Sequence, residues 1–75
     1  KIGHKRLIIA NKNIPNMIGE ITSLLAENSI NIGDMLNKSK GDFAYNIIDI
    51  DGEVSQDVLD KLQAVDGIIF AKVIG

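Results

Sequence analysis

The sequence lacks most of the residue types from which enzymes build catalytic or metal-binding sites. It contains no cysteine and no tryptophan, and its only histidine is His4. The absence of cysteine excludes disulfide bonds and thiolate metal sites, and it fits a reducing compartment such as the cytoplasm. The sequence also has no glycine-rich phosphate loop and no set of serine, histidine and aspartate. We therefore predict no catalytic residues, no metal site and no enzymatic activity for these 75 residues.

Long apolar runs and basic clusters are missing as well. No stretch approaches the roughly eighteen apolar residues of a membrane-spanning helix, and no signal peptide is recognisable, so we expect no membrane partner. The net charge is −2, and between Asp42 and Asp66 the only basic residue is Lys61. Nucleic-acid binding needs a denser basic patch, so we expect no nucleic-acid partner. The chain begins at Lys1 rather than at methionine, which predicts a piece of a longer protein.

The first half of the sequence changes from a strand pattern to a helix pattern and back. An apolar run at residues 6–11 is typical of a strand, and Pro15 suits the first turn of the helix that follows. Apolar residues then recur at intervals of three and four, which predicts an amphipathic helix that ends at residues 28–29. A second strand is predicted for residues 30–38.

The second half has a similar layout. A turn-forming cluster at residues 39–42 leads to a third strand at residues 43–51, so these two strands are predicted to form an antiparallel hairpin. Ser55 is a suitable N-cap for a second helix that ends near Ala64, and residues 68–74 form the last strand. The order βαββαβ with right-handed crossovers predicts an α+β, ferredoxin-like fold. Its four-stranded antiparallel sheet would carry both helices on one face.

Two short segments resemble the ACT domain, a small amino-acid-sensing module of metabolic enzymes. Asn13-Ile14-Pro15 matches the family's Asp/Asn-x-Pro turn, and Ile30-Asn31-Ile32 matches its hydrophobic-Asn-Ile start of the second strand. The likeness covers nearly the whole chain and extends to the C-terminal regulatory domains of phosphoglycerate dehydrogenases. It implies that residues 1–5 are a linker remnant and that residues 6–75 are an ACT-like regulatory domain.

This resemblance implies a role in the allosteric regulation of serine biosynthesis. The domain would bind an amino acid, L-serine in particular, between two copies of itself and regulate an attached catalytic domain. NAD would belong to that catalytic domain, and the ACT-like domain would hold no cofactor. The family's effector residues correspond here to Asn11 and Asn13 after the first strand and to Asn31 at the start of the second, and we expect these three to cluster. Their carboxamides supply donors and acceptors for a zwitterion, and the helical N–H groups near Asn16 and Met17 suit its carboxylate.

The strand pattern also predicts an apolar surface on the side of the sheet that faces away from the helices. A surface of this size is larger than a soluble monomer usually exposes. A second copy of the domain, a parent enzyme or a ligand could each cover it, and we predict a homodimer. Asn46 falls on the opposite, helix-facing side, where an amide without a partner would cost about 1–3 kcal/mol. The expected members of the dimer surface are Leu7, Ile9, Tyr45, Ile47, Ile68 and Phe70.

Several alternatives remain open at this point. The domain could hold subunits of the same enzyme together without binding an effector, and Asn16 favours this alternative because many ACT domains have glycine there. RNA-recognition domains share the element order, and residues 40–45 echo one of their motifs, but the first strand lacks the partner aromatic residue. Acylphosphatases also share the order, but Arg6, the only arginine, lies at the wrong end of its strand. Asp49 and Asp51 are close enough in sequence to form an acid–base pair.

Overall fold

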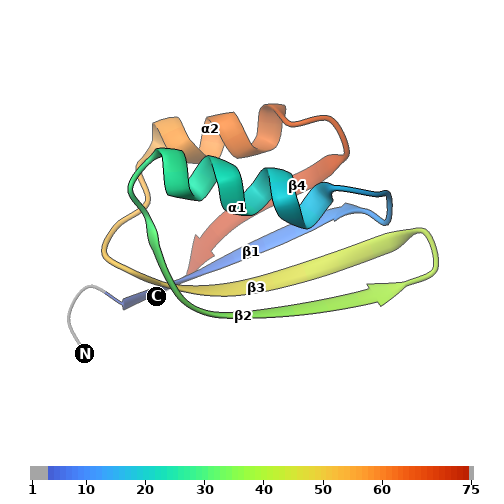
Figure 1. Cartoon of the computed structure of the whole chain (residues 1–75), viewed down its shortest axis with the longest axis horizontal. Coiled ribbons are helices and arrows are strands. Elements are labelled where there is room, and N and C mark those ends of the chain that lie inside the picture. The colour runs from blue at the N-terminus through green and yellow to red at the C-terminus, as the bar shows by residue number, and fades with distance from the viewer. Residues whose placement is uncertain (1–3, 75) are drawn as a thin grey trace.

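The computed structural model describes residues 4–74, and the element order βαββαβ is confirmed there (Figure 1). The first strand begins at His4, so residues 4–5 belong to the sheet rather than to a linker, and residues 1–3 lie outside the described residues. The first helix begins two residues after Pro15. The elements are β1 (His4–Lys12), α1 (Met17–Glu27), β2 (Asn31–Lys40), β3 (Phe43–Asp51), α2 (Gln56–Ala64) and β4 (Ile68–Ile74).

The four strands form one antiparallel sheet in the order β2-β3-β1-β4. Both helices lie on the same face of this sheet, and the other face is open (Figure 1). This arrangement confirms the predicted ferredoxin-like fold. The crossover through α1 returns the chain along the sheet, so β2 runs in the same direction as β1 with β3 between them. The start of β2 therefore lies at the same end of the sheet as the start of β1.

The hydrophobic core lies between the helices and the sheet. α1 contributes Met17, Ile21 and Leu25, which recur every four residues along one face of the helix. α2 contributes Val58 and Leu62 at the same spacing, and all five side chains are buried. Complete burial of one such aliphatic side chain contributes about 1.5–3 kcal/mol, so each of these contacts matters in a domain of this size. From the strands, the core receives Leu7, Ile9, Ile48, Ile50 and Ala71.

The predicted dimer surface is wrong for several of its members. Leu7 and Ile9 are completely buried in the core, and Ile68 packs against the same core. β1 is apolar on both sides, so its alternation alone does not reveal which side faces the helices. For Ile68 the cause is a β-bulge, because the pairing of β1 with β4 shifts by one residue between Ala10 and Asn11. That shift moves Ile68 from the open face to the helix-facing side.

The open face of the sheet still carries large apolar side chains. Tyr45 and Ile47 lie there because they alternate with buried residues along β3, and Phe70 pairs with Ala10 of β1 on the same side. Leu36 of β2 is 49% exposed and Tyr45 is 50% exposed. The open face therefore has an apolar centre, although its members differ from those expected.

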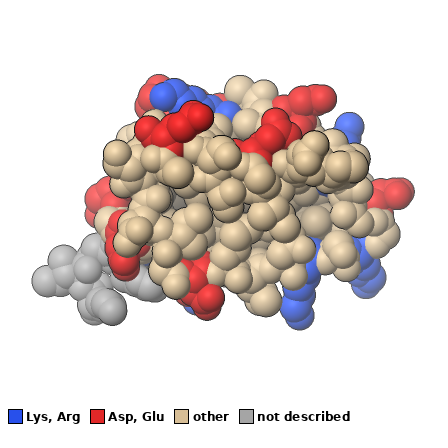
Figure 2. Space-filling view, viewed as in Figure 1, with Lys and Arg blue, Asp and Glu red and all other residues tan. Residues whose placement is uncertain are grey.

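Acidic and basic side chains are spread over both layers of the molecule, but some basic side chains gather at one end of the sheet. Figure 2 shows acidic side chains over the helices and elsewhere on the surface, and basic side chains that project at the lower right. The lysines at this end of the sheet are Lys12, Lys38 and Lys40, which are all exposed. The carboxylate of Asp42 lies in the β2–β3 hairpin at the same end, so these lysines share this end of the sheet with an acidic residue. In the part of the chain that the structure describes, no helix is long and apolar enough to cross a membrane.

Candidate functional site

The turn between β1 and α1 is held by backbone hydrogen bonds to two distant parts of the chain. The N–H of Lys12 donates to the carbonyl of Gly67, in the turn before β4, over 2.8 Å. The N–H of Asn13 donates to the carbonyl of Asp42, in the β2–β3 hairpin, also over 2.8 Å. The Asn13 side chain adds a hydrogen bond of 3.1 Å from Nδ2 to the carbonyl of Gly41. These hydrogen bonds hold the turn in position at the end of the sheet.

The helix α1 begins from an uncommon backbone conformation. Asn16, the residue before the first helical residue, has a φ of 71°, in the left-handed region. Asparagine adopts this region more readily than most other non-glycine residues, so it can stand where glycine would also fit. Its side chain makes no capping hydrogen bond. The first N–H groups of α1 therefore have no side-chain acceptor from Asn16, and the positive end of the helix dipole favours a negative group there.

A small pocket lies beside this turn, on the helix-facing side of the sheet. Its volume is about 190 Å³. This is smaller than the roughly 300–1,000 Å³ of pockets for drug-sized ligands, and it suits a small metabolite. The effector residues predicted in the turn and at the start of the helix all line it, namely Asn11, Asn13, Asn16 and Met17. The other lining residues are Ile14, Ile18, Gly19, Asn37, Ser39 and Ala44. We refer to this site as the asparagine pocket.

Asn31 does not reach the asparagine pocket of its own chain. It pairs with Asp51, the last residue of β3, whereas Asn11 pairs with Ala44 near the beginning of β3. The two asparagines therefore lie at opposite ends of the sheet, and the predicted cluster of three asparagines within one chain is wrong. The cause is the crossover through α1, which returns the chain to the end of the sheet where β1 starts.

Asn46, on the helix-facing side of β3, is completely buried and hydrogen-bonded at both ends of its amide. Its Nδ2 donates to Asn11 Oδ1 over 2.7 Å, and its Oδ1 accepts from Asn37 Nδ2 over 2.8 Å. Asn11 Nδ2 donates in turn to the backbone carbonyl of Lys12 over 2.7 Å. The sequence-based prediction omitted Asn37 and Ser39. The signal for Asn37 was its position in the hairpin, where it pairs directly with Asn46.

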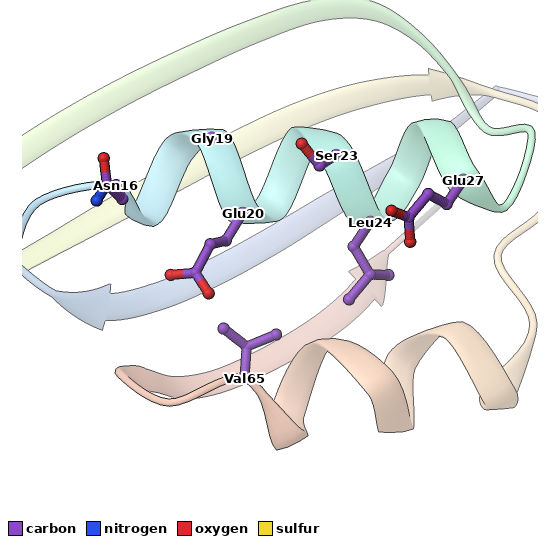
Figure 3. A pocket seen from close by; sticks show the side chains of 7 residues that line it. All are labelled: Asn16, Gly19, Glu20, Ser23, Leu24, Glu27 and Val65. Carbon is purple, nitrogen blue, oxygen red and sulfur yellow. The ribbon is translucent and has the colours of Figure 1, made fainter.

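A larger and shallower hollow runs along the side of α1 that faces α2 (Figure 3), with a volume of about 480 Å³. Figure 3 shows Leu24 of α1 and Val65 after α2 pointing into the space between the two helices. The carboxylates of Glu20 and Glu27 flank this space and would repel a ligand that carries a free carboxylate. The asparagine pocket is therefore the better candidate for an amino acid. The shallow hollow is completed by Asn16, Gly19 and Ser23.

The carboxylate pair suggested for acid–base chemistry does not form a shared site. Asp49 Oδ1 accepts a hydrogen bond of 2.8 Å from Arg6 Nε, and this contact raises the pKa of the Arg6 guanidinium. Asp51 lies exposed at the end of β3. Between residues 4 and 74, no three or more histidine, aspartate or glutamate side chains gather in a way that could hold a metal ion. The asparagine pocket is thus the strongest candidate site.

Comparisons with known proteins give one curated relative and several solved structures with the same fold. No family model matches the sequence. A D-3-phosphoglycerate dehydrogenase of Haemophilus influenzae is 26% identical over 72 residues, which cover 96% of this chain and 18% of that enzyme. The chain thus spans less than a fifth of the length of this curated relative.

Solved structures share the fold at low sequence identity. The ACT domain of a GTP pyrophosphokinase from Chlorobium tepidum superposes with a TM-score of 0.80 at 18% identity, over 95% of this chain and 96% of that one. The regulatory subunit of aspartate kinase from Thermus thermophilus superposes with a TM-score of 0.76 at 14% identity, over 96% of this chain and 50% of that one.

Proposed function

We propose that this chain, which has the fold of an ACT domain, is an amino-acid-binding regulatory domain of a phosphoglycerate dehydrogenase. L-Serine is the proposed effector, and the attached enzyme would be an NAD-dependent enzyme of serine biosynthesis in the cytoplasm. The support comes from the curated relative, which matches along nearly the whole of this chain, and from the chemistry of the asparagine pocket.

The single observation that carries the proposal is the asparagine pocket at the start of α1. The uncapped first turn of α1 presents backbone N–H groups, and its dipole contributes about 0.3–1 kcal/mol to binding an anion. The carboxamides around it offer acceptor oxygens as well as donors. A neutral lining of this kind accommodates an ammonium and a carboxylate together, whereas a charged lining would repel one of them. The pocket is therefore suited to a small zwitterion.

A second copy of the domain would complete the pocket. β2 is an edge strand, and every one of its residues is at least partly exposed, so its outer backbone groups are available for pairing. We propose that two β2 strands pair antiparallel around a twofold axis at Met35. Asn31 of each copy would then lie beside Ser39 of the other, at the mouth of the asparagine pocket. A ligand held by both copies would make its affinity depend on their relative position, which is the basis of an allosteric signal.

The oligomeric state tests this arrangement. Sedimentation of the unmodified chain at micromolar concentration should show twice the monomer mass. Leu36→Asp should dissociate the dimer, and its measured mass should be that of the monomer, because the new carboxylates would lie near the twofold axis and repel each other. Phe70→Asp is the matched control on the opposite edge strand, and it should remain dimeric. Dissociation by both substitutions would instead place the contact on the open face of the sheet. A monomeric unmodified chain would contradict the proposed dimer.

Ligand binding tests the proposed effector. Asn31→Ala removes a hydrogen bond to a charged ligand group, worth about 1.5–3 kcal/mol, so the affinity for L-serine should fall by roughly tenfold or more. Asn31 is exposed at the end of its strand, so circular dichroism should show an unchanged fold. Gln63→Ala, on the exposed side of α2, should leave the affinity unchanged. Equal affinity of the Asn31→Ala variant and the unmodified chain would place the effector elsewhere.

A purely structural role in dimerisation is the second candidate function. The observation in its favour is Asn16, which lines the pocket and occupies space with a side chain where many ACT domains have glycine. In that case the dimer would form, but calorimetry with L-serine and with other small amino acids would show no heat of binding.

A further inference from the structure

Three of the four asparagines in the sheet form a continuous series of hydrogen bonds across three strands. Asn37 of β2 donates to Asn46 of β3, Asn46 donates to Asn11 of β1, and Asn11 donates to the backbone carbonyl of Lys12. The three distances are 2.8, 2.7 and 2.7 Å. We call these side chains the amide chain. Asn46 is its buried centre, and Asn37 is its exposed end, on the wall of the asparagine pocket.

The direction of the amide chain is set by donor and acceptor chemistry. A backbone carbonyl can only accept, so the Asn11 group that meets Lys12 must be the NH₂ of the carboxamide. Asn11 then turns its oxygen towards Asn46, which must donate to it. Asn46 in turn directs its own oxygen towards Asn37, which must donate as well. The carbonyl of Lys12 thus fixes the orientation of all three carboxamides.

This orientation leaves a hydrogen-bond acceptor at the exposed end of the amide chain. Asn37 donates its NH₂ to Asn46, and its Oδ1 makes no hydrogen bond to the rest of residues 4–74. The first turn of α1, on the same pocket, presents donors. We propose that Asn37 Oδ1 accepts a hydrogen bond from the ammonium group of the effector and that Asn46 is a positioning residue that holds Asn37 in this orientation. The proposal rests on the proposed function and adds to it the residue that selects for an α-amino group.

The composition of the core supports a specific role for Asn46. The neighbouring residues on its face of β3 are Ala44 and Ile48, and an apolar side chain of similar volume could fill its place. A buried carboxamide needs partners for its polar atoms, so it constrains the residues around it more than a valine would. Here the partners of Asn46 are two residues that line the asparagine pocket. The amide chain therefore leads from Asn46, inside the molecule, to Asn37 on the wall of the asparagine pocket, where the effector would bind.

A comparison of two ligands tests the role of Asn37. L-Serine and 3-hydroxypropanoate differ only in the amino group, and calorimetry would measure the affinity of each for the unmodified chain and for Asn37→Ala. The unmodified chain should prefer L-serine by about tenfold or more, as expected for a hydrogen bond between a charged group and a protein acceptor. Asn37→Ala should lose this preference, with the affinity for 3-hydroxypropanoate nearly unchanged. Asn37 is exposed, so the variant should fold.

The outcomes separate this inference from the proposed function. If the unmodified chain binds L-serine and Asn37→Ala keeps the same preference over 3-hydroxypropanoate, the role of Asn37 is refuted while the proposed function stands. If the unmodified chain binds neither ligand, both are refuted.

A second variant tests the positioning role of Asn46. Asn46→Val keeps a similar volume but removes the hydrogen bonds to Asn37 and Asn11. It should reduce the preference for L-serine over 3-hydroxypropanoate, an effect that a merely structural residue would not produce. NMR should show slow exchange of the Asn46 side-chain amide protons in the unmodified chain, because this amide is buried. Fast exchange, or an unchanged ligand preference in a folded Asn46→Val variant, would overturn the positioning role. If Asn46→Val does not fold, the exchange measurement decides.

Discussion

Replacement of Gly67 by alanine should destabilise the domain, although it adds only one methyl group. Gly67 has a φ of 100°, where non-glycine residues are strained. An added Cβ would lie 2.8 Å from Met17 Sδ and 3.1 Å from Ile14 Cδ1. Met17 is 3% exposed, so its side chain would have to repack to make room for the added Cβ. Backbone strain and overpacking together should cost about 2–4 kcal/mol.

This cost is large compared with the roughly 4–11 kcal/mol that stabilise a domain of this length. In urea unfolding followed by circular dichroism, this loss of stability should appear as a lower urea concentration at the midpoint of unfolding. Gly19→Ala is the matched control, because nothing lies within 4 Å of its added Cβ and alanine is favoured in a helix interior by about 1 kcal/mol. The same substitution should therefore lower the free energy of unfolding at Gly67 and raise it at Gly19. An unchanged midpoint for Gly67→Ala would refute the close packing of the turn before β4 against the start of α1.

Three further substitutions test the elements that position the pocket. Leu25→Ala removes a completely buried side chain of α1 and should cost about 2–5 kcal/mol in urea unfolding, whereas a cost below about 1 kcal/mol would contradict the packing of α1 on the sheet. Ser55→Ala removes the oxygen that accepts from the N–H of Val58 at the start of α2, and it should lower the free energy of unfolding by about 0.5–2 kcal/mol. Asn16→Ala should be less stable than Asn16→Gly by about 1 kcal/mol because of the left-handed backbone, and the reverse order in thermal unfolding would contradict that conformation.

The elements of the fold could be predicted because each has a strong local signal. Of the apolar residues of α1 that recur at intervals of three and four, Met17, Ile21 and Leu25 become buried, whereas Ile18 stays exposed. Ser55 caps α2 as expected, with its side chain accepting from the N–H of Val58. The hairpin between β2 and β3 turns at Gly41, which has a φ of 63°. These features depend on residues close in sequence, where periodicity and turn chemistry are informative.

The errors concern features that depend on residues far apart in sequence. Leu7 and Ile9 were placed on the wrong side because both sides of β1 are apolar, and only its register with neighbouring strands identifies the buried side. The bulge that displaces Ile68 has no signature in the sequence. Asn31 was expected beside Asn11, but strand direction places the two at opposite ends of the sheet. The partners of Asn46 likewise come from two different strands.

The most direct test of the proposed site is complementation between two variants. Asn13→Ala damages the asparagine pocket of its own copy, and Asn31→Ala damages the contact that a copy makes with the pocket of its partner. Each variant alone should bind L-serine weakly. A mixed dimer contains one site with both asparagines intact, so mixing the two variants after unfolding and refolding together should restore a population of sites with the affinity of the unmodified chain. Calorimetry that detects only the weak affinity of the separate variants in the mixed sample would contradict an effector site shared between two copies.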